Sequence, residues 1–169
     1  MCNRIPQSIL LVAGLCLASA ALAAPKTYTP LSGNPSGTYR IDPQHTNVFF
    51  TIGHVGITQF TGRFDKISGT YIFNTKNPAA DKVDITIPAA SINTDFALRD
   101  QHLRSKEFFD VKRYPTITFV SSKYVPTGTK TGTLYGNLTL HGVTKPVTFQ
   151  VQEIGAGNVP YLPKPWGGY

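Results

Sequence analysis

Apolar and polar residues alternate along most of the chain after Thr38. Residues 83–87 show the pattern most clearly, because Val83, Ile85 and Ile87 are separated by single polar residues. A period of two is that of an extended strand with one buried and one polar face. Glycine, asparagine and proline interrupt such runs at intervals typical of an antiparallel meander. The pattern therefore predicts a protein built mainly of strands.

The stretch around residue 50 predicts a strand with apolar residues on both faces. Val48, Phe50 and Ile52 share one parity, whereas Phe49 and Thr51 have the other. Successive side chains of a strand point to opposite sides of its sheet. We therefore expect both faces of this strand to contact other groups.

Residues 62–74 predict one long strand. Ile67, Tyr71 and Phe73 share a parity, and Gly69 lies between them. A glycine inside a strand often marks a bulge or a bend. We expect Gly69 to bend this strand.

The strongest hairpin signal lies near the end of the chain. On the two sides of the connection at residues 141–145, apolar side chains recur with one parity: Leu134, Leu138, Leu140, Val147, Phe149 and Val151. Such a pattern across a short, glycine-containing connection predicts an antiparallel pair. Ile117 and Phe119 begin a further strand. The sequence thus predicts six main strands, with short ones near residues 39–41 and 56–60.

One interval departs from the strand pattern. Residues 95–104 carry apolar and charged side chains at helical spacing. Thr94 precedes them and is expected to cap the helix through its hydroxyl. Ser105 is expected to cap a second short turn that ends at Phe109. We expect this helical segment to cross a sheet face or a barrel mouth.

Strands with one apolar face must bury it, in a two-sheet sandwich or in a curled sheet. We expect strands of about nine to thirteen residues, a length that favours the curled sheet. The predicted fold class is therefore all-β with one short helical segment, arranged as an antiparallel β-barrel.

The first segment has the pattern of a cleaved secretory signal. Arg4 is followed by an apolar stretch at residues 9–17 and by small residues at 21–23. The alternative is a membrane anchor, but this apolar stretch is well short of the roughly 20 residues that span a bilayer. We expect residues 1–23 to be the signal, and the protein to be periplasmic or secreted.

Both cysteines, Cys2 and Cys16, lie in that segment, so a mature chain that begins at Ala24 has no disulfide. A lipid anchor on Cys16 is disfavoured, because the large Leu15 precedes it. Residues 24–37 are rich in proline, serine, glycine and threonine, and predict a flexible leader. Residues 38–169 then form one domain.

The formal net charge is +7, which drops by one unit when the signal is removed. A positive balance favours anionic partners or membrane surfaces, and it is equally compatible with a solvated basic surface.

The sequence offers little catalytic chemistry. It contains no nucleophile elbow, no zinc-protease motif and no phosphate-binding loop. His45, His54, His102 and His141 lie far apart along the chain. The densest charged cluster spans residues 99–110 and is either a solvated helix face or a polar rim over a pocket. We expect no enzyme activity and no cofactor or metal.

Three blocks of sequence resemble one known family. The first comprises residues 39–50 (YRIDPQHTNVFF), 53–56 (GHVG) and 62–64 (GRF). The second comprises residues 92–95 (INTD), 99–111 (RDQHLRSKEFFDV) and 114–119 (YPTITF). The third is residues 136–149 (GNLTLHGVTKPVTF). Their content and order resemble the YceI-like family of secreted bacterial lipid-binding proteins, over about residues 39–154.

This resemblance implies an eight-stranded, lipocalin-like antiparallel barrel whose interior holds a long amphiphile such as a polyisoprenoid or a quinone. It implies transport or storage without catalysis. The apolar residues with matching parity become candidates for the cavity lining: Val48, Phe50, Ile52, Val83, Ile85, Ile87, Phe119, Leu134, Leu138 and Phe149. For each of them, ordinary core packing is the alternative. His54 and Arg99 are the candidates for polar groups near the lipid head group.

The chain departs from the family pattern after Ile154, where the resemblance implies two more strands. Residues 160–165 contain three prolines, which disfavours a central strand. We therefore expect an open barrel with two unpaired strand edges, which favour association with another chain, including a second copy.

Two alternatives come from other classes of protein. A β-barrel nucleic-acid binder is suggested by the positive charge and by Tyr71 and Tyr135 as exposed aromatic residues, although no basic run is interleaved with aromatic residues. An enzyme acting at the barrel mouth would use His54 or His102. We expect an amphiphilic lipid as the partner and no nucleic acid, and transient contact with a membrane surface is left open.

Overall fold

The computed structural model describes residues 29–30, 35–158 and 166–168. Its elements are β1 (Thr29–Pro30), β2 (Gly37–Arg40), β3 (Val48–His54), β4 (Thr58–Phe64), β5 (Ser68–Phe73), η1 (Pro78–Ala80), β6 (Lys82–Pro88), η2 (Ala89–Ser91), β7 (Ile92–Asn93), α1 (Ala97–Arg104), β8 (Thr116–Pro126), β9 (Thr131–Leu140), β10 (Val143–Gln152), β11 (Gly155–Asn158) and β12 (Trp166–Gly168). The signal at residues 1–23, most of the leader and the proline-rich residues 160–165 lie outside the described residues.

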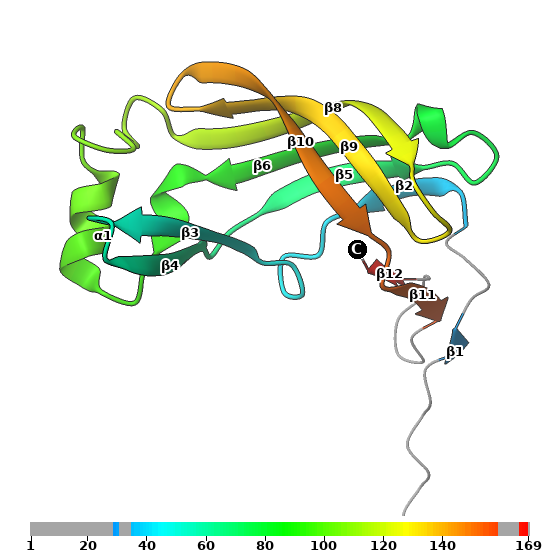
Figure 1. Cartoon of the computed structure of the whole chain (residues 1–169), viewed down its shortest axis with the longest axis horizontal. Helices are drawn as coiled ribbons and strands as arrows, with labels where there is room; N and C mark the ends of the chain where they lie inside the picture. Colours follow the sequence, from blue (N-terminus) through cyan, green and yellow to red (C-terminus); the bar gives the residue numbers. More distant parts are fainter. Residues whose placement is uncertain (1–28, 31–34, 159–165, 169) are drawn as a thin grey trace, which may run out of the picture.

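The strands form three antiparallel sheets. The largest has the order β10-β9-β8-β6-β5-β2, and it curls (Figure 1). The other two contain β3, β4 and β7, and β1, β11 and β12. A mostly β chain with one short helix is thus confirmed. Within the described part of the chain no ladder joins β10 to β2, so the six-stranded sheet is open there.

The single strand predicted at residues 62–74 is wrong. β4 ends at Phe64 and β5 begins at Ser68, and the two strands belong to different sheets. Ile67, in the link between them, is only 9% exposed and joins the core. The chain passes from one sheet to the other here, but Ile67 stays buried. The alternation of apolar residues therefore continues across the break and gives no sign of it.

The strand lengths also differ from expectation. Strands of ten or eleven residues are limited to β8, β9 and β10, and the other main strands have six or seven. Gly69 does not end its ladder, because it pairs with Ile85 inside β5. A Cβ atom at this glycine would lie 2.1 Å from the carbonyl oxygen of Asp84. Gly69 therefore allows close approach of two backbones.

The predicted hairpin near the end of the chain is confirmed as β9 and β10. Leu140 pairs with Val143, so the turn consists of His141 and Gly142 alone. Both turn residues have positive φ, at 51° and 73°. Two left-handed residues characterise the type I′ turn, whose twist matches that of the flanking strands.

The core lies between the six-stranded sheet and the smaller sheet of β3, β4 and β7. Its buried cluster consists of Ile67, Ile87, Ala89 and Ile117. Partly buried side chains from both sheets and from the segment after α1 pack against it: Ile41, Val48, Phe64, Ile85, Phe109, Val111 and Leu138.

The helix begins later than predicted. α1 starts at Ala97, and the residue before it, Phe96, makes no capping hydrogen bond through its side chain. The Thr94 hydroxyl does not cap the helix but donates to the Asp100 carboxylate. The expected turn after Ser105 is present. The Ser105 hydroxyl accepts a hydrogen bond from the Glu107 backbone N–H at 3.3 Å.

Candidate functional site

One face of the six-stranded sheet carries most of the apolar residues predicted to line a cavity. Residues directly opposite each other in a ladder point to the same side. Ile85 is opposite Phe119, and Phe119 is opposite Leu138. Leu134 is opposite Phe149. With alternation along each strand, the register places these predicted residues on one face, here called the apolar face: Val83, Ile85, Ile87, Phe119, Leu134, Leu138 and Phe149.

The apolar face is packed near β6 and open toward the β9–β10 edge. Ile87 belongs to the buried core cluster. Phe119 is also buried, and its ring meets that of Phe149 edge-on at 5.2 Å between centroids. Phe149 itself is 46% exposed, and Val143 on the same strand is 55% exposed. Core packing alone therefore accounts for the β6 side, whereas the β10 side has uncovered apolar area.

The candidates on β3 become more exposed along the strand. Val48 packs against the core cluster, and the Phe50 ring lies 5.7 Å from the Phe64 ring. Ile52 is 60% exposed, and His54 is exposed at the end of the strand. The hairpin of β3 and β4 thus leaves the core and extends beyond it.

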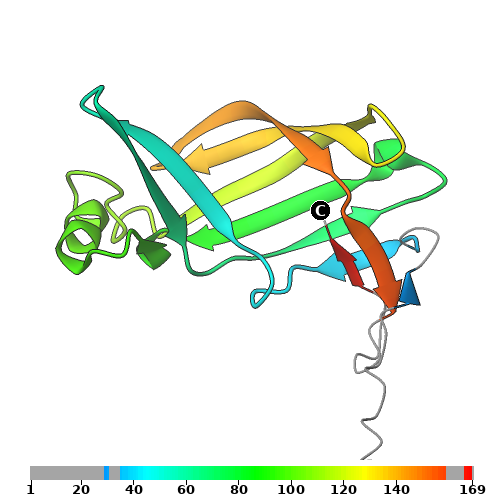
Figure 2. The same ribbon diagram turned by 60° about the horizontal axis from the view of Figure 1, so that its bottom comes forward.

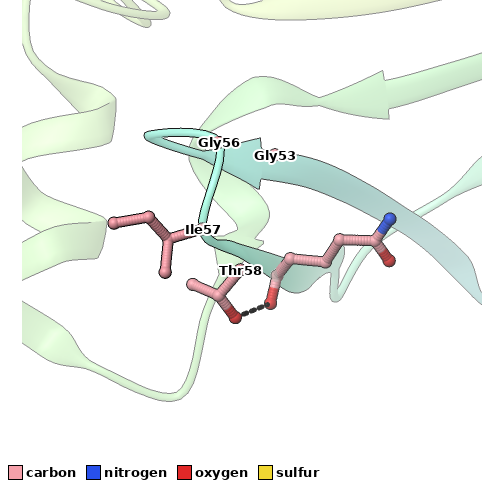
Figure 3. A pocket seen from close by; sticks show the side chains of 5 residues that line it. Gly53, Gly56, Ile57 and Thr58 are labelled. Atoms are coloured by element: carbon pink, nitrogen blue, oxygen red, sulfur yellow. Dashed lines mark hydrogen bonds between the residues drawn. The ribbon is translucent and has the colours of Figure 1, made fainter.

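A shallow hollow of about 370 Å³ lies at the tip of this hairpin (Figure 3). Its lining residues are Gly53, Gly56, Ile57, Thr58 and Gln59. Figure 3 shows the Ile57 side chain extending away from the hairpin backbone. All the walls come from one hairpin, so the hollow is too open to enclose a ligand.

Three tyrosines lie at another part of the apolar face, and the sequence pattern did not identify them as a group. Tyr39 is opposite Tyr71, and their rings stack at 4.8 Å. Tyr71 is opposite Val83, and Tyr124 is opposite Leu134, which places both on this face. Their position on one face depends on the registers of several ladders, and alternation within one strand gives no sign of it.

The environment of these tyrosines is desolvated and weakly acidic. Burial raises the pKa of Tyr71 to about 12, with smaller contributions from Tyr39 and Glu153. Burial also raises the pKa of Tyr124, assisted by the carboxylates of Asp81 and Glu153. The Asp81 pKa is itself raised by burial. This part of the face therefore presents neutral hydroxyl groups at ordinary pH.

Arg99 belongs to α1, and local contacts hold its guanidinium in place. Its guanidinium donates to the Thr94 hydroxyl at 2.8 Å and to the Thr94 carbonyl at 2.7 Å. The same group lies 3.9 Å above the Phe60 ring on β4. Asp100 is buried and accepts from the Thr94 backbone N–H at 2.9 Å. Among residues 35–157 no hydrogen bond or ion pair joins Arg99 to His54, so their shared role at a head group stays a prediction.

A second network ties β4 to the segment before α1. Arg63 donates to both Asp95 oxygens at 3.1 Å and to Asp65 at 2.9 Å. Those two carboxylates raise the Arg63 pKa. Hydrogen bonds from Asn93 and then from Arg63 lower the Asp65 pKa. This network lies outside the charged cluster at residues 99–110, and it fixes β4 to the segment that precedes α1.

The comparison with known families matches residues 39–161 to the YceI-like domain. The chain belongs to the YceI-like family. A similar curated relative is a UPF0312 protein of Yersinia enterocolitica, 46% identical over 133 residues. That alignment covers 78% of this chain, and the chain spans 66% of that relative's length.

Solved structures of similar proteins support the YceI-like fold. The Campylobacter jejuni YceI protein is 36% identical with a TM-score of 0.56, and the match covers 70% of this chain and 69% of that one. Burkholderia cenocepacia BcnA is 27% identical with a TM-score of 0.64, and the match covers 69% of this chain and 75% of that one.

The histidines of this YceI-like chain have separate surroundings. His45 lies 2.6 Å from Asp42, and His102 lies 2.6 Å from Glu107. The His141 ring packs at 4.4 Å on Tyr114. Within the described ranges no group of three or more histidine, cysteine, aspartate or glutamate side chains is arranged to hold a metal ion.

Two further observations bear on the alternatives. Tyr71 is half-buried, which corrects its prediction as an exposed aromatic residue, whereas Tyr135 is 40% exposed. The nucleic-acid interpretation thus loses one of its two aromatic residues. None of the helices in the described part of the chain is long and apolar enough to cross a bilayer.

Proposed function

We propose that this YceI-like protein binds a long-chain amphiphile, such as an isoprenoid or a quinone, on the apolar face for transport or storage, without catalysis. The observation that carries the proposal is the uncovered apolar area on the β10 side of that face, with Phe149 46% exposed beside the buried Phe119. Removing apolar area from water contributes roughly 25 cal/mol per Å², before the costs of association. A long tail therefore needs few specific contacts.

The proposal also states where the ligand lies on the protein and where the protein acts. We propose that the tail lies along the apolar face and that the protein acts in the periplasm or outside the cell, as the signal pattern of residues 1–23 implies. The predicted cavity residues become the proposed lining. His54 and Arg99 are kept as proposed polar contacts of the head group.

The first experiment is extraction of the purified protein with organic solvent, followed by mass spectrometry. We expect a long-chain amphiphile in independent preparations, at a constant ratio to protein. If several preparations contain none, and the protein also takes up none from added isoprenoid alcohol or quinone, the proposal is wrong.

A matched pair of variants tests the face itself. Phe149→Asp places a charge on the apolar face, and Thr148→Asp places the same charge on the next residue of β10, which points to the other side. Burial of a phenylalanine contributes enough that its loss should weaken ligand binding by about tenfold or more. We expect the Thr148 variant to bind like the parent. Equal loss in both variants would contradict binding on this face.

A further inference from the structure

We propose that the end of the molecule formed by the β3–β4 tip, α1 and residues 105–114, here called the docking end, binds the surface of an anionic lipid bilayer. The inference does not depend on the ligand proposed above, because it concerns side chains outside the apolar face. Both views place these segments at the same end of the long axis (Figures 1 and 2).

The tip of the hairpin carries apolar side chains that are largely exposed. Val55 is 74% exposed and Ile57 is 86% exposed. Val55 also has φ of 47°, in the left-handed region that β-branched residues seldom adopt. Asparagine or glycine would suit that backbone better. An exposed valine at such a position points to a role for its side chain outside the fold.

α1 and its flanks add further apolar side chains. Phe96 is 54% exposed, Leu98 69% and Phe108 49%. The contact of Arg99 with Phe60, 3.9 Å from guanidinium carbon to ring centre, fixes the helix against β4. The apolar groups therefore protrude from segments that are held in place relative to each other.

Basic side chains accompany these apolar positions. Lys106, Lys112 and Arg113 are exposed and take part in no ion pair among residues 35–157. The whole chain has a net charge of +7. Apolar side chains that enter the interface, surrounded by basic ones at the level of the head groups, are the pattern of a peripheral membrane contact.

Acidic side chains in the same segments leave this positive charge largely uncompensated. Asp100 and Asp110 are buried and half-buried, respectively. Asp95 pairs with Arg63. Over residues 97–114 the five lysine and arginine side chains outnumber the three aspartate and glutamate side chains. Repulsion between the docking end and anionic lipid is therefore small.

The arrangement fits a bilayer better than a protein partner. A stable protein interface needs a continuous complementary patch of about 800 Å² on each side. Here the apolar groups stand on separate protrusions, with charged residues between them. A fluid surface can accommodate separate protrusions without matching their shape.

The test measures sedimentation of the purified protein with vesicles of phosphatidylglycerol and phosphatidylethanolamine, and with vesicles of phosphatidylcholine alone. We expect binding to the anionic vesicles that weakens with added salt, and little binding to the neutral ones. Equal partition into both kinds of vesicle, or into neither, would overturn the proposal.

Variants assign the contact to the docking end. We expect the double variant Ile57→Ser, Leu98→Ser to bind the anionic vesicles about tenfold more weakly. The control is Ile154→Ser, because Ile154 is 77% exposed but follows β10, away from α1 (Figure 1). A loss in the control as large as in the double variant would show that a different surface binds.

Charge variants complete the test. Replacing Lys106, Lys112 and Arg113 by glutamine should weaken binding roughly fivefold for each residue. Every variant carries the same first segment, residues 1–23. Differences in vesicle binding between the variants therefore report on the docking end. Ligand content measured by extraction should stay at the parental level in every variant, which separates this proposal from the proposed function. Unchanged vesicle binding in the charge variants would overturn it.

Discussion

At the scale of single residues, Gly136 on β9 illustrates how the sheet accommodates an aromatic ring. A Cβ atom there would lie 2.5 Å from the Phe119 ring and 2.6 Å from the carbonyl oxygen of Val120. The carbonyl oxygen of Val120 belongs to the backbone, so it cannot move away as the end of a flexible side chain would. We expect Gly136→Ala to lower the free energy of unfolding by about 1–3 kcal/mol, measured by chemical denaturation.

Gly53→Ala is the matched control, because Gly53 also lies in a strand and a Cβ atom added to it would meet nothing within 4 Å. We expect its effect to stay within about 0.5 kcal/mol. If both substitutions cost the same, loss of backbone freedom at glycine rather than contact with Phe119 would explain the result.

Tyr71 gives a prediction on alkaline pH. Burial first, then Tyr39 and Glu153, raise its pKa from 10.0 to about 12. The unfolded chain therefore releases this proton at lower pH than the folded protein. The contribution to stability is full below pH 10.0 and is lost as the pH rises toward about 12. Titration of tyrosinate absorbance should show a tyrosine that titrates near pH 12 and is absent from Tyr71→Phe.

The pH dependence of stability in Tyr71→Phe provides the result that would contradict this prediction. If the stability of Tyr71→Phe falls between pH 10.0 and about 12 as steeply as that of the parent, the shifted tyrosine is a different one.

At the scale of elements, α1 is attached through a buried carboxylate rather than through an N-cap. Asp100 accepts hydrogen bonds from the backbone N–H and the hydroxyl of Thr94. Asp100→Ala leaves those buried donors without this acceptor. We expect a loss of about 1–3 kcal/mol in the free energy of unfolding.

Glu107→Ala is the comparison within the same segment. Its pair with His102 is exposed, with 58% and 66% of the two side chains accessible. Exposed pairs contribute at most about 1 kcal/mol. A larger loss in Glu107→Ala than in Asp100→Ala, both followed by thermal unfolding, would contradict this assignment.

The predicted connection at residues 141–145 is longer than the actual turn of two residues. The pairing of β9 with β10 could nevertheless be predicted, because the connection between these strands is too short for any other arrangement. The end of β4 at Phe64 could not. Phe64 at the end of β4 and Ile67 in the link to β5 both join the same core, so the sequence pattern does not record the change of sheet between them. The charged cluster at residues 99–110 was likewise identified from the sequence, but the contacts of Arg99 and Asp100 with Thr94 were not.

At the scale of the whole molecule, two of the outer strands, β10 and β3, differ in how they discourage association. β10 carries Lys145 and Pro146, which oppose pairing with another strand. β3 has neither proline nor a lysine, and Phe49 on it is 63% exposed. In the described part of the chain β3 pairs with β4 alone, so its other edge is open.

We therefore expect reversible self-association through β3 at high concentration. Phe49→Lys should raise the concentration needed for association by roughly fivefold, because like charges meet across the paired strands. Analytical ultracentrifugation measures this shift. Thr148→Lys, on the edge that is already protected, serves as the control. An equal shift in both variants would point to net charge rather than to the β3 edge.

By itself the sequence determined the mostly β character with one short helix, the pairing of the main hairpin, the family blocks and the apolar parity that defines the apolar face. Those features depend on the periodicity within one strand and on contacts between segments that are neighbours in the sequence. A single strand or a single turn is therefore enough to show them. Only the tertiary structure decided where the chain changes sheets, that Tyr39, Tyr71 and Tyr124 share one face, and which apolar residues stay exposed. These depend on which strands become neighbours and in what register, and that choice is made by the packing of the whole chain.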